Sequence, residues 1–452
     1  LVYDIYPYMT FDYRYGEPGR LPKPRISQMH YTIAQLRNVT ATYGRELGFW
    51  VGTYSDNWFQ RFKSPERKNQ YWSEQEMSFT AIAQGADYLI SPSNFNGSNL
   101  PMDSLHWEGY SEAMKVVQKA GKGLLAAPKV KARACFLFPR TQYLLLQKEY
   151  YNVGLTYELF LRAFGELDIL HEEQITDDKL NGYKVLVMGD VTLLPAEAAR
   201  HIVRFVRNGG VVIADCVPQM DAYKRPLDVM NRLFGVRKAG TERIPREGQW
   251  VPFTMLPPKM SFPPADGSGS ETERTDVVRG TAFGEACNFS VASPRGCVLA
   301  DGKARLMLGS GRPALVYRKE GKGSAYLFGF CMQDSYFNTW KNRDTAGRRQ
   351  LRELIGDIFS EAGIQSHIYS SNPDIEASVR ANAKEGYVFI INHEASRPST
   401  TVRLADLAFP IGKIVDIGSG EDIPFTRKGG AVEFNIDATL GETKLLEVKT
   451  IL

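Results

Sequence analysis

The chain has 452 residues, enough for several domains, because a single hydrophobic core stops growing at about 250–300 residues. Hydrophobic residues make up 43% and charged residues 23%, which is typical of globular proteins and excludes wholesale disorder. The net charge of +4 comes from lysines and arginines scattered along the chain, so neither a nucleic-acid partner nor an anionic membrane is expected. No apolar run reaches the roughly 18 residues that a membrane-spanning helix needs, so a soluble protein without a membrane partner is predicted.

Residues 1–128 alternate strands and helices in the rhythm of a parallel sheet. Strands are predicted at 1–8, 46–54 and 87–95, and helices at 30–43, 73–86 and 111–121. In the second helix, Ser73 is predicted to be the N-cap and Glu76 its capping-box partner. Three such units do not close a parallel α/β fold, so we expect an incomplete (β/α)8 barrel, with any active site at the carboxyl ends of its strands.

Residues 129–365 have the pattern of an open, doubly wound α/β domain. Strands are predicted at 131–139, 184–190, 211–216 and 323–330, and helices at 156–166, 196–210 and 348–363. Residues 240–310 are rich in proline, glycine and charge and are predicted to form an irregular insertion.

Residues 366–452 consist of short alternating runs separated by turn residues, which predicts a small antiparallel β-sandwich. Asn392, His393 and Glu394 end one of these strands. Because neighbouring side chains point to opposite faces of a strand, they make a poor metal site, and a turn is the simpler prediction. No metal site and no cofactor are expected anywhere in the chain.

The five cysteines are an odd number, widely spaced, with no CxxC pair. This spacing favours a reduced cytoplasm over a disulfide framework. The chain opens at Leu1 inside a predicted strand, so a secretion signal upstream stays an open alternative.

The order of the three parts resembles that of the family 42 glycoside hydrolases: a barrel, a flavodoxin-like trimerisation domain similar to class I glutamine amidotransferases, and a small sandwich. Local matches lie in the strand–helix–strand stretch 183–216, in the helix and strand of 76–95, and in the last part at Asn392, His393, Asp416 and Gly420. The resemblance implies that the opening strands are the sixth to eighth of the barrel. It also implies hydrolysis of β-linked sugars, such as β-galactosides, a possible homotrimer, and an acid/base glutamate outside this chain.

The family's nucleophile is a glutamate a few residues before an Asn-Trp pair, and Asn57-Trp58 matches that pair. The glutamate position falls near Gly52 or Thr53, neither of which is a carboxylate. A relative that has lost hydrolysis and binds carbohydrate, or serves as a scaffold, is therefore the alternative prediction.

Glycoside hydrolysis normally needs two carboxyl groups beside the scissile bond. Asp56, in the loop after the second strand, is the candidate catalytic carboxylate, and an aspartate that closes an Asx-turn is the alternative. Aromatic rings pack on the apolar faces of sugars, while amide and carboxylate groups bind the hydroxyl groups. The candidates for such binding, all near strand ends, are Asp4, Tyr6, Tyr54, Asn57, Trp58 and Asn94.

Cys216 follows a predicted strand at about the place where amidotransferases carry their nucleophile. Asp215 and Val217 flank it where glycines would be needed for a strained elbow. A buried core cysteine is the favoured prediction, and amidotransferase-like activity is a minor alternative.

Overall fold

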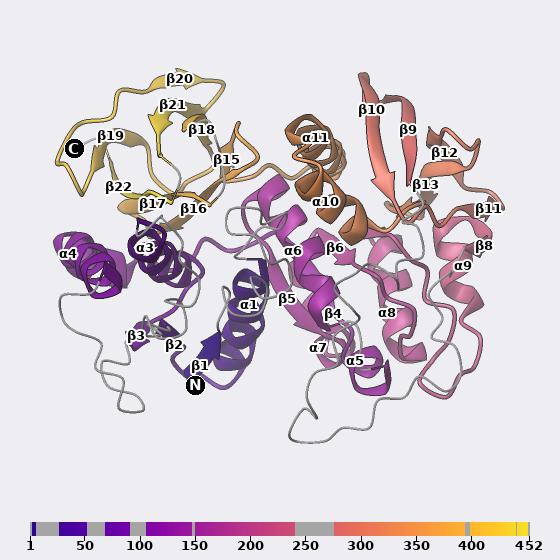
Figure 1. Ribbon diagram of the computed structural model, residues 1–452. Coiled ribbons are helices and arrows are strands. Elements are labelled where there is room, and N and C mark those ends of the chain that lie inside the picture. The colour runs from indigo at the N-terminus through magenta and orange to yellow at the C-terminus, as the bar shows by residue number, and fades with distance from the viewer. Residues whose placement is uncertain are drawn as a thin grey trace, which may run out of the picture. The chain divides into compact units, whose positions relative to one another are not determined.

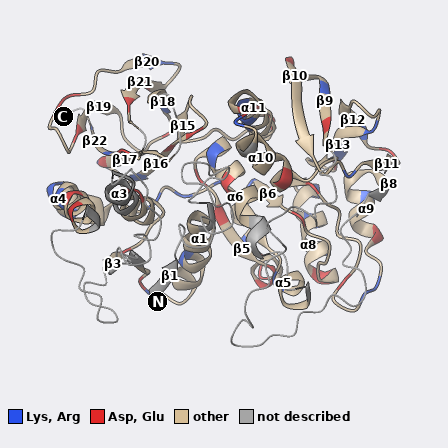
Figure 2. Ribbon diagram, in the orientation of Figure 1, with Lys and Arg blue, Asp and Glu red and all other residues tan. Residues whose placement is uncertain are grey.

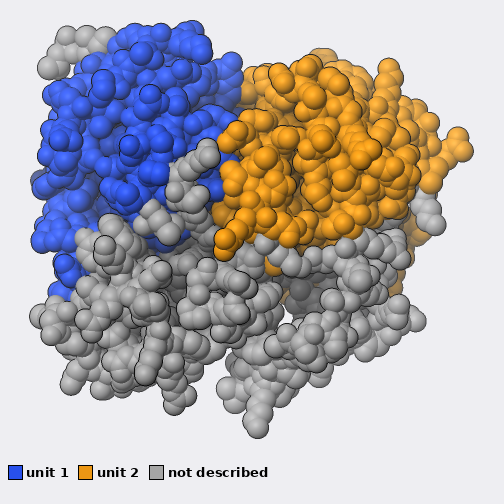
Figure 3. Space-filling model, turned by 45° about the horizontal axis from the view of Figure 1, so that its top comes forward, with its two compact units in different colours: residues 1–131, 160–166, 365–452 blue, residues 132–159, 167–364 orange. Residues whose placement is uncertain are grey.

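The computed structural model describes residues 2–5, 27–51, 68–90, 105–146, 150–239, 275–393, 398–439 and 441–450. Two compact units are present (Figure 3). Unit 1 consists of Leu1–Lys131, Phe160–Glu166 and Gln365–Leu452, and unit 2 of Ala132–Leu159 and Leu167–Ile364. Lys and Arg are interspersed with Asp and Glu in both units (Figure 2). The division into three domains at 128/129 and 365/366 stays a prediction.

The first part of unit 1 is a parallel three-stranded sheet with helices between its strands (Figure 1). The strands are β1 (Val2–Ile5), β2 (Gly48–Val51) and β3 (Tyr88–Ile90), and the helices are α1 (Ser27–Thr42), α3 (Lys68–Ala83) and α4 (Leu105–Ala126). Met29, Ile33, Phe49 and Met77 form the core that joins α1 and α3 to β2. The alternation of strands and helices thus follows the apolar pattern of the sequence.

The predicted cap of the second helix is wrong. Helix α3 begins at Lys68, so Ser73 and Glu76 lie inside the helix and not at its start. Glu76 is buried, with 3% of its surface exposed, which a residue of a solvated first turn would not be. Tertiary contacts of this helix therefore override the local capping signal.

Unit 2 is built on a nine-stranded sheet with the order β10-β9-β12-β13-β14-β7-β6-β4-β5. Strands β5, β4, β6, β7 and β14 run parallel, and their order along the chain is 2-1-3-4-5, that of flavodoxin-like sheets. They span β4 Ala134–Phe138, β5 Asp168–His171, β6 Val185–Met188, β7 Val211–Ala214 and β14 Gly323–Phe328. The prediction of an open, flavodoxin-like sheet is confirmed for this part of the chain.

The helices between residues 140 and 361 are α5 (Arg140–Leu146), α6 (Tyr150–Phe164), α7 (Glu172–Thr176), the 3-10 helix η2 (Lys179–Gly182), α8 (Ala196–Arg207), α9 (Asp228–Phe234), α10 (Met332–Lys341) and α11 (Thr345–Glu361). Buried apolar residues of α7, η2, α8 and α9 share one core with the sheet. In α8, Ala198, Ile202, Val203 and Phe205 recur at helical spacing and are buried. Among the helices that the structure describes, none is long and apolar enough to cross a lipid bilayer.

The irregular structure predicted for 240–310 is wrong for residues 275–308, and residues 240–274 lie outside the described part. The strands here are β9 (Thr275–Ala282), β10 (Glu285–Ala292), β11 (Cys297–Leu299) and β12 (Lys303–Leu308). β9, β10 and β12 extend the large sheet together with β13 (Pro313–Glu320), and β11 pairs with β8 (Val236–Ala239). Strands β9 and β10 are partly exposed and therefore contain many polar residues. For this reason their sequences lack the apolar alternation that predicts a strand.

The C-terminal part consists of two four-stranded antiparallel sheets, β15-β18-β21-β20 and β16-β17-β22-β19. The strands are β15 Ile368–Ser370, β16 Ile375–Ala381, β17 Glu385–Asn392, β18 Ser399–Leu404, β19 Ile411–Asp416, β20 Thr426–Lys428, β21 Ala431–Asp437 and β22 Thr443–Thr450. Val379 and Val388 of one sheet share a core with Val402 and Phe434 of the other. Two sheets around one core make this part a β-sandwich, as predicted.

Candidate functional site

The residues predicted to meet a sugar lie at or beyond the carboxyl ends of β1, β2 and β3. The backbone of Asp4 belongs to β1 and pairs with Trp50 of β2. The others, which are Tyr6, Tyr54, Asp56, Asn57, Trp58 and Asn94, lie outside the described residues, as do Gly52 and Thr53. Because the three strands are parallel, their carboxyl ends lie at one edge of the sheet. The roles of these residues stay predictions.

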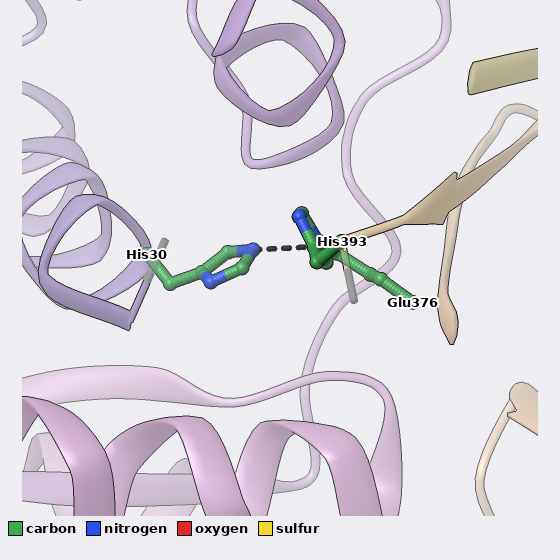
Figure 4. A group of neighbouring side chains, drawn as sticks. All are labelled: His30, Glu376 and His393. Carbon is green, nitrogen blue, oxygen red and sulfur yellow. Dashed lines mark hydrogen bonds and ion pairs between the residues drawn. The ribbon is translucent and has the colours of Figure 1, made fainter. Parts of the chain in front are cut away.

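A buried group of acidic and basic side chains lies within unit 1 (Figure 4). Helix α1 contributes His30, helix α3 contributes Glu76, and the sandwich contributes Glu376 of β16 and His393, which follows β17. These four side chains are buried. Residues that are up to 346 positions apart in the sequence therefore form one cluster, called the His–Glu network below.

Glu376 is at the centre of the His–Glu network. Its Oε2 lies 2.8 Å from Nε2 of His30 and 2.7 Å from Nε2 of His393. Its Oε1 accepts hydrogen bonds from Ser378 Oγ at 2.9 Å and Gln84 Nε2 at 3.2 Å. Nδ1 of His393 contacts Oε1 of Glu76. With a carboxylate at each ring nitrogen, His393 is positioned to donate from both, as only the imidazolium form can.

Electrostatics favour the charged forms in this network. Burial raises the pKa of Glu376, but the charge of His30 and the hydrogen bonds from both histidines outweigh it, so the pKa lies well below its usual value. Burial lowers the pKa of His393, but the attraction of Glu76 and the hydrogen bonds to both glutamates outweigh it, so the pKa is raised. Glu376 and His393 are thus a pair of opposite charges shielded from water.

The ligand atoms of His30, Glu376 and His393 lie within 4.8 Å of one another, as the ligands of a metal ion would. The 2.7 and 2.8 Å separations between nitrogen and oxygen are, however, those of charge-assisted hydrogen bonds. Arg162 Nη2 also lies 3.9 Å from Oε2 of Glu376 and adds a positive charge where a metal ion would bring another. An ion-pair network that joins helices α1 and α3 to the sandwich is the simpler interpretation of these contacts.

Two sequence predictions are corrected by the His–Glu network. Glu76 is not a helix-start residue, and His393 does not merely serve a turn, because both are buried and paired with each other. A signal for Glu76 was present in the sequence, since Glu76, Thr80 and Gln84 place polar groups at i, i+4 and i+8 of one helix face. His393 stood out in the sequence only as part of a strand end, and no local pattern linked it to Glu76 or Glu376.

His393 is expected to make the stability of unit 1 depend on pH. Because its pKa is raised by folding, its contribution is complete below the unfolded pKa of about 6.5 and is lost as the pH rises through the folded pKa. Urea unfolding of the wild type and of His393→Gln between about pH 6 and pH 9 measures this effect. The stability advantage of the wild type should shrink as the pH rises, and an advantage that grows would contradict the raised pKa.

A second buried charge cluster lies in unit 2, at the carboxyl ends of β6 and β7. Arg295 pairs with Asp190, donates from Nη1 to the Asp215 carbonyl oxygen at 2.8 Å, and lies 3.6 Å from Oδ1 of Asp215. Asp215 also accepts hydrogen bonds from the backbone N–H groups of Asp190 at 2.7 Å and Met332 at 2.9 Å. Burial raises the pKa of Asp215, and the charge of Arg295 offsets part of this rise.

Cys216, the predicted alternative nucleophile, follows Asp215 directly. The residue is 3% exposed, and its Sγ lies 3.9 Å from the carbonyl oxygen of Val217. All five cysteines of the chain are free thiols. The burial of Cys216 fits a core role better than that of a nucleophile that must meet a substrate.

No family model matches the sequence. A β-1,2-glucosyltransferase from Ignavibacterium album is 21% identical over 240 residues, which are 52% of this chain and 27% of that protein. The chain thus spans about a quarter of the length of this curated relative.

Solved structures of glycosidases share the fold. A family 42 β-galactosidase from G. stearothermophilus matches with a TM-score of 0.63 at 14% identity, covering 99% of this chain and 59% of that one. A cold-adapted β-galactosidase from Rahnella sp. matches with a TM-score of 0.64 at 14% identity, covering 99% and 60%. An α-L-fucosidase from Paenibacillus thiaminolyticus matches with a TM-score of 0.58 at 15% identity, covering 91% and 61%. The chain therefore resembles family 42 glycoside hydrolases in fold over nearly its whole length and spans about three fifths of theirs.

Proposed function

We propose that this chain is the C-terminal portion of a protein that acts on β-linked sugars, with β-galactosides as the first substrates to test. The observation that carries the proposal is the likeness to family 42 β-galactosidases over 99% of this chain and 59–60% of theirs. On this proposal, β1, β2 and β3 are the last three strands of a (β/α)8 barrel. Unit 2 would contain the trimerisation-like domain, and the protein would be a homotrimer.

The sugar would bind at the edge where β1, β2 and β3 end, since barrel enzymes carry their sites at the carboxyl ends of the strands. Tyr6, Tyr54 and Trp58 would pack on the sugar rings, and Asp4, Asn57 and Asn94 would bind the hydroxyl groups. Asp56 would be one of the two carboxyl groups that glycoside hydrolysis needs. The acid/base glutamate would come from the part of the protein that corresponds to the rest of the galactosidase chain.

Two alternatives rest on specific observations. The residues at the expected nucleophile position, Gly52 and Thr53, carry no carboxylate, which favours a relative that binds carbohydrate without hydrolysing it. The weak likeness to a β-1,2-glucosyltransferase favours transfer of a sugar to another sugar in place of water. Fold alone does not separate these activities, because functions differ among proteins of one fold.

The test uses the product of the complete coding sequence with a panel of nitrophenyl glycosides. Hydrolysis of at least one β-glycoside is expected, and Asp56→Asn should lower kcat at least about a hundredfold, because the reaction would lose one of its two carboxyl groups. Asp422→Asn, an exposed aspartate of the sandwich, is the control and should leave kcat unchanged.

Each other outcome identifies a different activity. Disaccharide formation when free glucose is added would identify a transferase. Saturable sugar binding without turnover, weakened by Trp58→Ala, would identify the non-catalytic alternative. A protein that neither binds nor converts any of these sugars would overturn the proposal.

A further inference from the structure

An open pocket of about 520 Å³ lies in unit 2 and shares no lining residue with the charge clusters described above. Helices α8 and α9, which lie side by side, and strand β13 supply its lining residues (Figure 1). Five arginines face this space, which we call the arginine pocket: Arg200, Arg204, Arg207, Arg232 and Arg318. Its volume is within the range of about 300–1,000 Å³ that is common for sites of small molecules.

Three of these guanidinium groups have no ion-pair partner among the described residues. Glu320, the one carboxylate among the described lining residues, accepts from Arg207 Nε at 2.7 Å and also pairs with Arg318. Arg318 additionally pairs with Asp301 at 3.0 Å. The guanidinium groups of Arg200, Arg204 and Arg232 make no hydrogen bond or ion pair with any residue that the structure describes. The pocket thus concentrates positive charge that the described part of the chain leaves without a neutralising partner.

Helix stability alone does not explain this arrangement. Arg204 and Arg207 lie in the last turn of α8, where cations interact favourably with the helix dipole. Arg200 precedes Arg204 by four residues, a spacing at which like charges repel one another on a helix. Arg232 and Arg318 come from a second helix and a strand, so three separate elements direct cations toward one space.

The lining indicates the chemistry of a ligand. Guanidinium groups bind the oxygens of phosphate and sulfate in bidentate pairs, which lysine cannot form. The partly buried Val229 lines the same pocket beside Val203 and Leu233, whose side chains are buried, and offers an apolar contact for the CH groups of an organic moiety. We propose that the arginine pocket binds a small organic phosphate or sulfate ester, of about the size of a phosphorylated or sulfated sugar. This proposal is independent of the proposed activity on glycosides.

Isothermal titration of the chain at constant ionic strength tests the proposal. The probes are glucose 6-phosphate, glucose 6-sulfate, inorganic phosphate and unmodified glucose, in a buffer without phosphate or sulfate. We expect saturable binding of at least one ester, more tightly than inorganic phosphate, and no binding of glucose. The two esters distinguish a phosphate site from a sulfate site. If neither ester bound at concentrations up to about 10 mM, the proposal would be overturned, because a Kd above this value corresponds to a very small binding free energy.

Matched variants separate the pocket from general charge attraction. Arg200→Gln with Arg204→Gln should weaken ester binding about tenfold per guanidinium lost, since charge-assisted hydrogen bonds are the strong ones. The control removes two exposed arginines of the same unit, Arg279→Gln with Arg349→Gln, and should leave the affinity unchanged. Equal weakening by both pairs would overturn the proposal in favour of non-specific attraction.

A third variant is expected to bind the ester more tightly and not more weakly. Glu320→Gln removes the carboxylate that occupies Arg207 and Arg318, so ester binding should become several-fold tighter. Thermal unfolding of each variant without ligand checks that the fold is retained. Weaker binding by a folded Glu320→Gln variant would contradict a pocket whose guanidinium groups contact the ester directly.

Discussion

Glu376→Gln is expected to lower the free energy of unfolding by about 3–5 kcal/mol, the cost typical of removing one partner from a buried ion pair. The glutamine side chain has nearly the same shape but no charge, so His393 would lose one of its two carboxylates and His30 its charged acceptor. Neither histidine can turn to water instead, because both are buried. Chemical denaturation near pH 6, below the raised pKa of His393 and above the lowered pKa of Glu376, measures the loss.

The matched control for this prediction is Glu112→Gln. Glu112 pairs with Lys115 on the exposed surface of α4, in the same unit, and such pairs contribute about 0–1 kcal/mol. The difference between the two variants therefore isolates the effect of burial. If Glu376→Gln cost no more than the control, the His–Glu network would not hold helices α1 and α3 on the sandwich.

The parallel strands could be predicted from the sequence because each is a short, continuous apolar run. β4, β6 and β7 are buried along their whole length and lie where the runs predicted them. β5, at the end of the large sheet, was missed, since only Ile169 and Leu170 of its four residues are buried. Strands with little apolar surface, such as β9 and β10, likewise gave no clear signal.

The His–Glu network could not be predicted, because its pairs are distant in the sequence. His30 and Glu376 are 346 residues apart, and Glu76 and His393 are 317 apart. Helical and strand periodicities report on faces within one element and contain no information about which faces will meet. The sugar site was predicted from a different rule, that the carboxyl ends of parallel strands lie at one edge of a sheet. The parallel pairing of β1, β2 and β3 agrees with the strand direction that this prediction assumed.

Arg295→Met is the other change with a large expected effect, again about 3–5 kcal/mol, because it leaves two buried carboxylates without their cation. Asp190 and Asp215 would face each other's charge at the ends of β6 and β7, and the pKa of Asp215, already raised by burial, would rise further. Hydrogen exchange should show the loss of protection first in β6, β7 and β14, which lie side by side in the sheet.

A double-mutant cycle with Arg295→Met and Asp190→Asn measures how much of the expected loss of stability comes from the charge of Arg295. Asp190 has a φ of 50°, a left-handed conformation that asparagine also tolerates, so the substitution removes the charge without straining the backbone. In the Arg295→Met background, Asp190→Asn removes one of the unpaired carboxylates and should restore part of the lost stability, whereas in the wild type it should destabilise. The coupling energy expected for such contacting groups is about 0.5–3 kcal/mol. Additive effects of the two substitutions would mean that Arg295 contributes through packing and not through its charge.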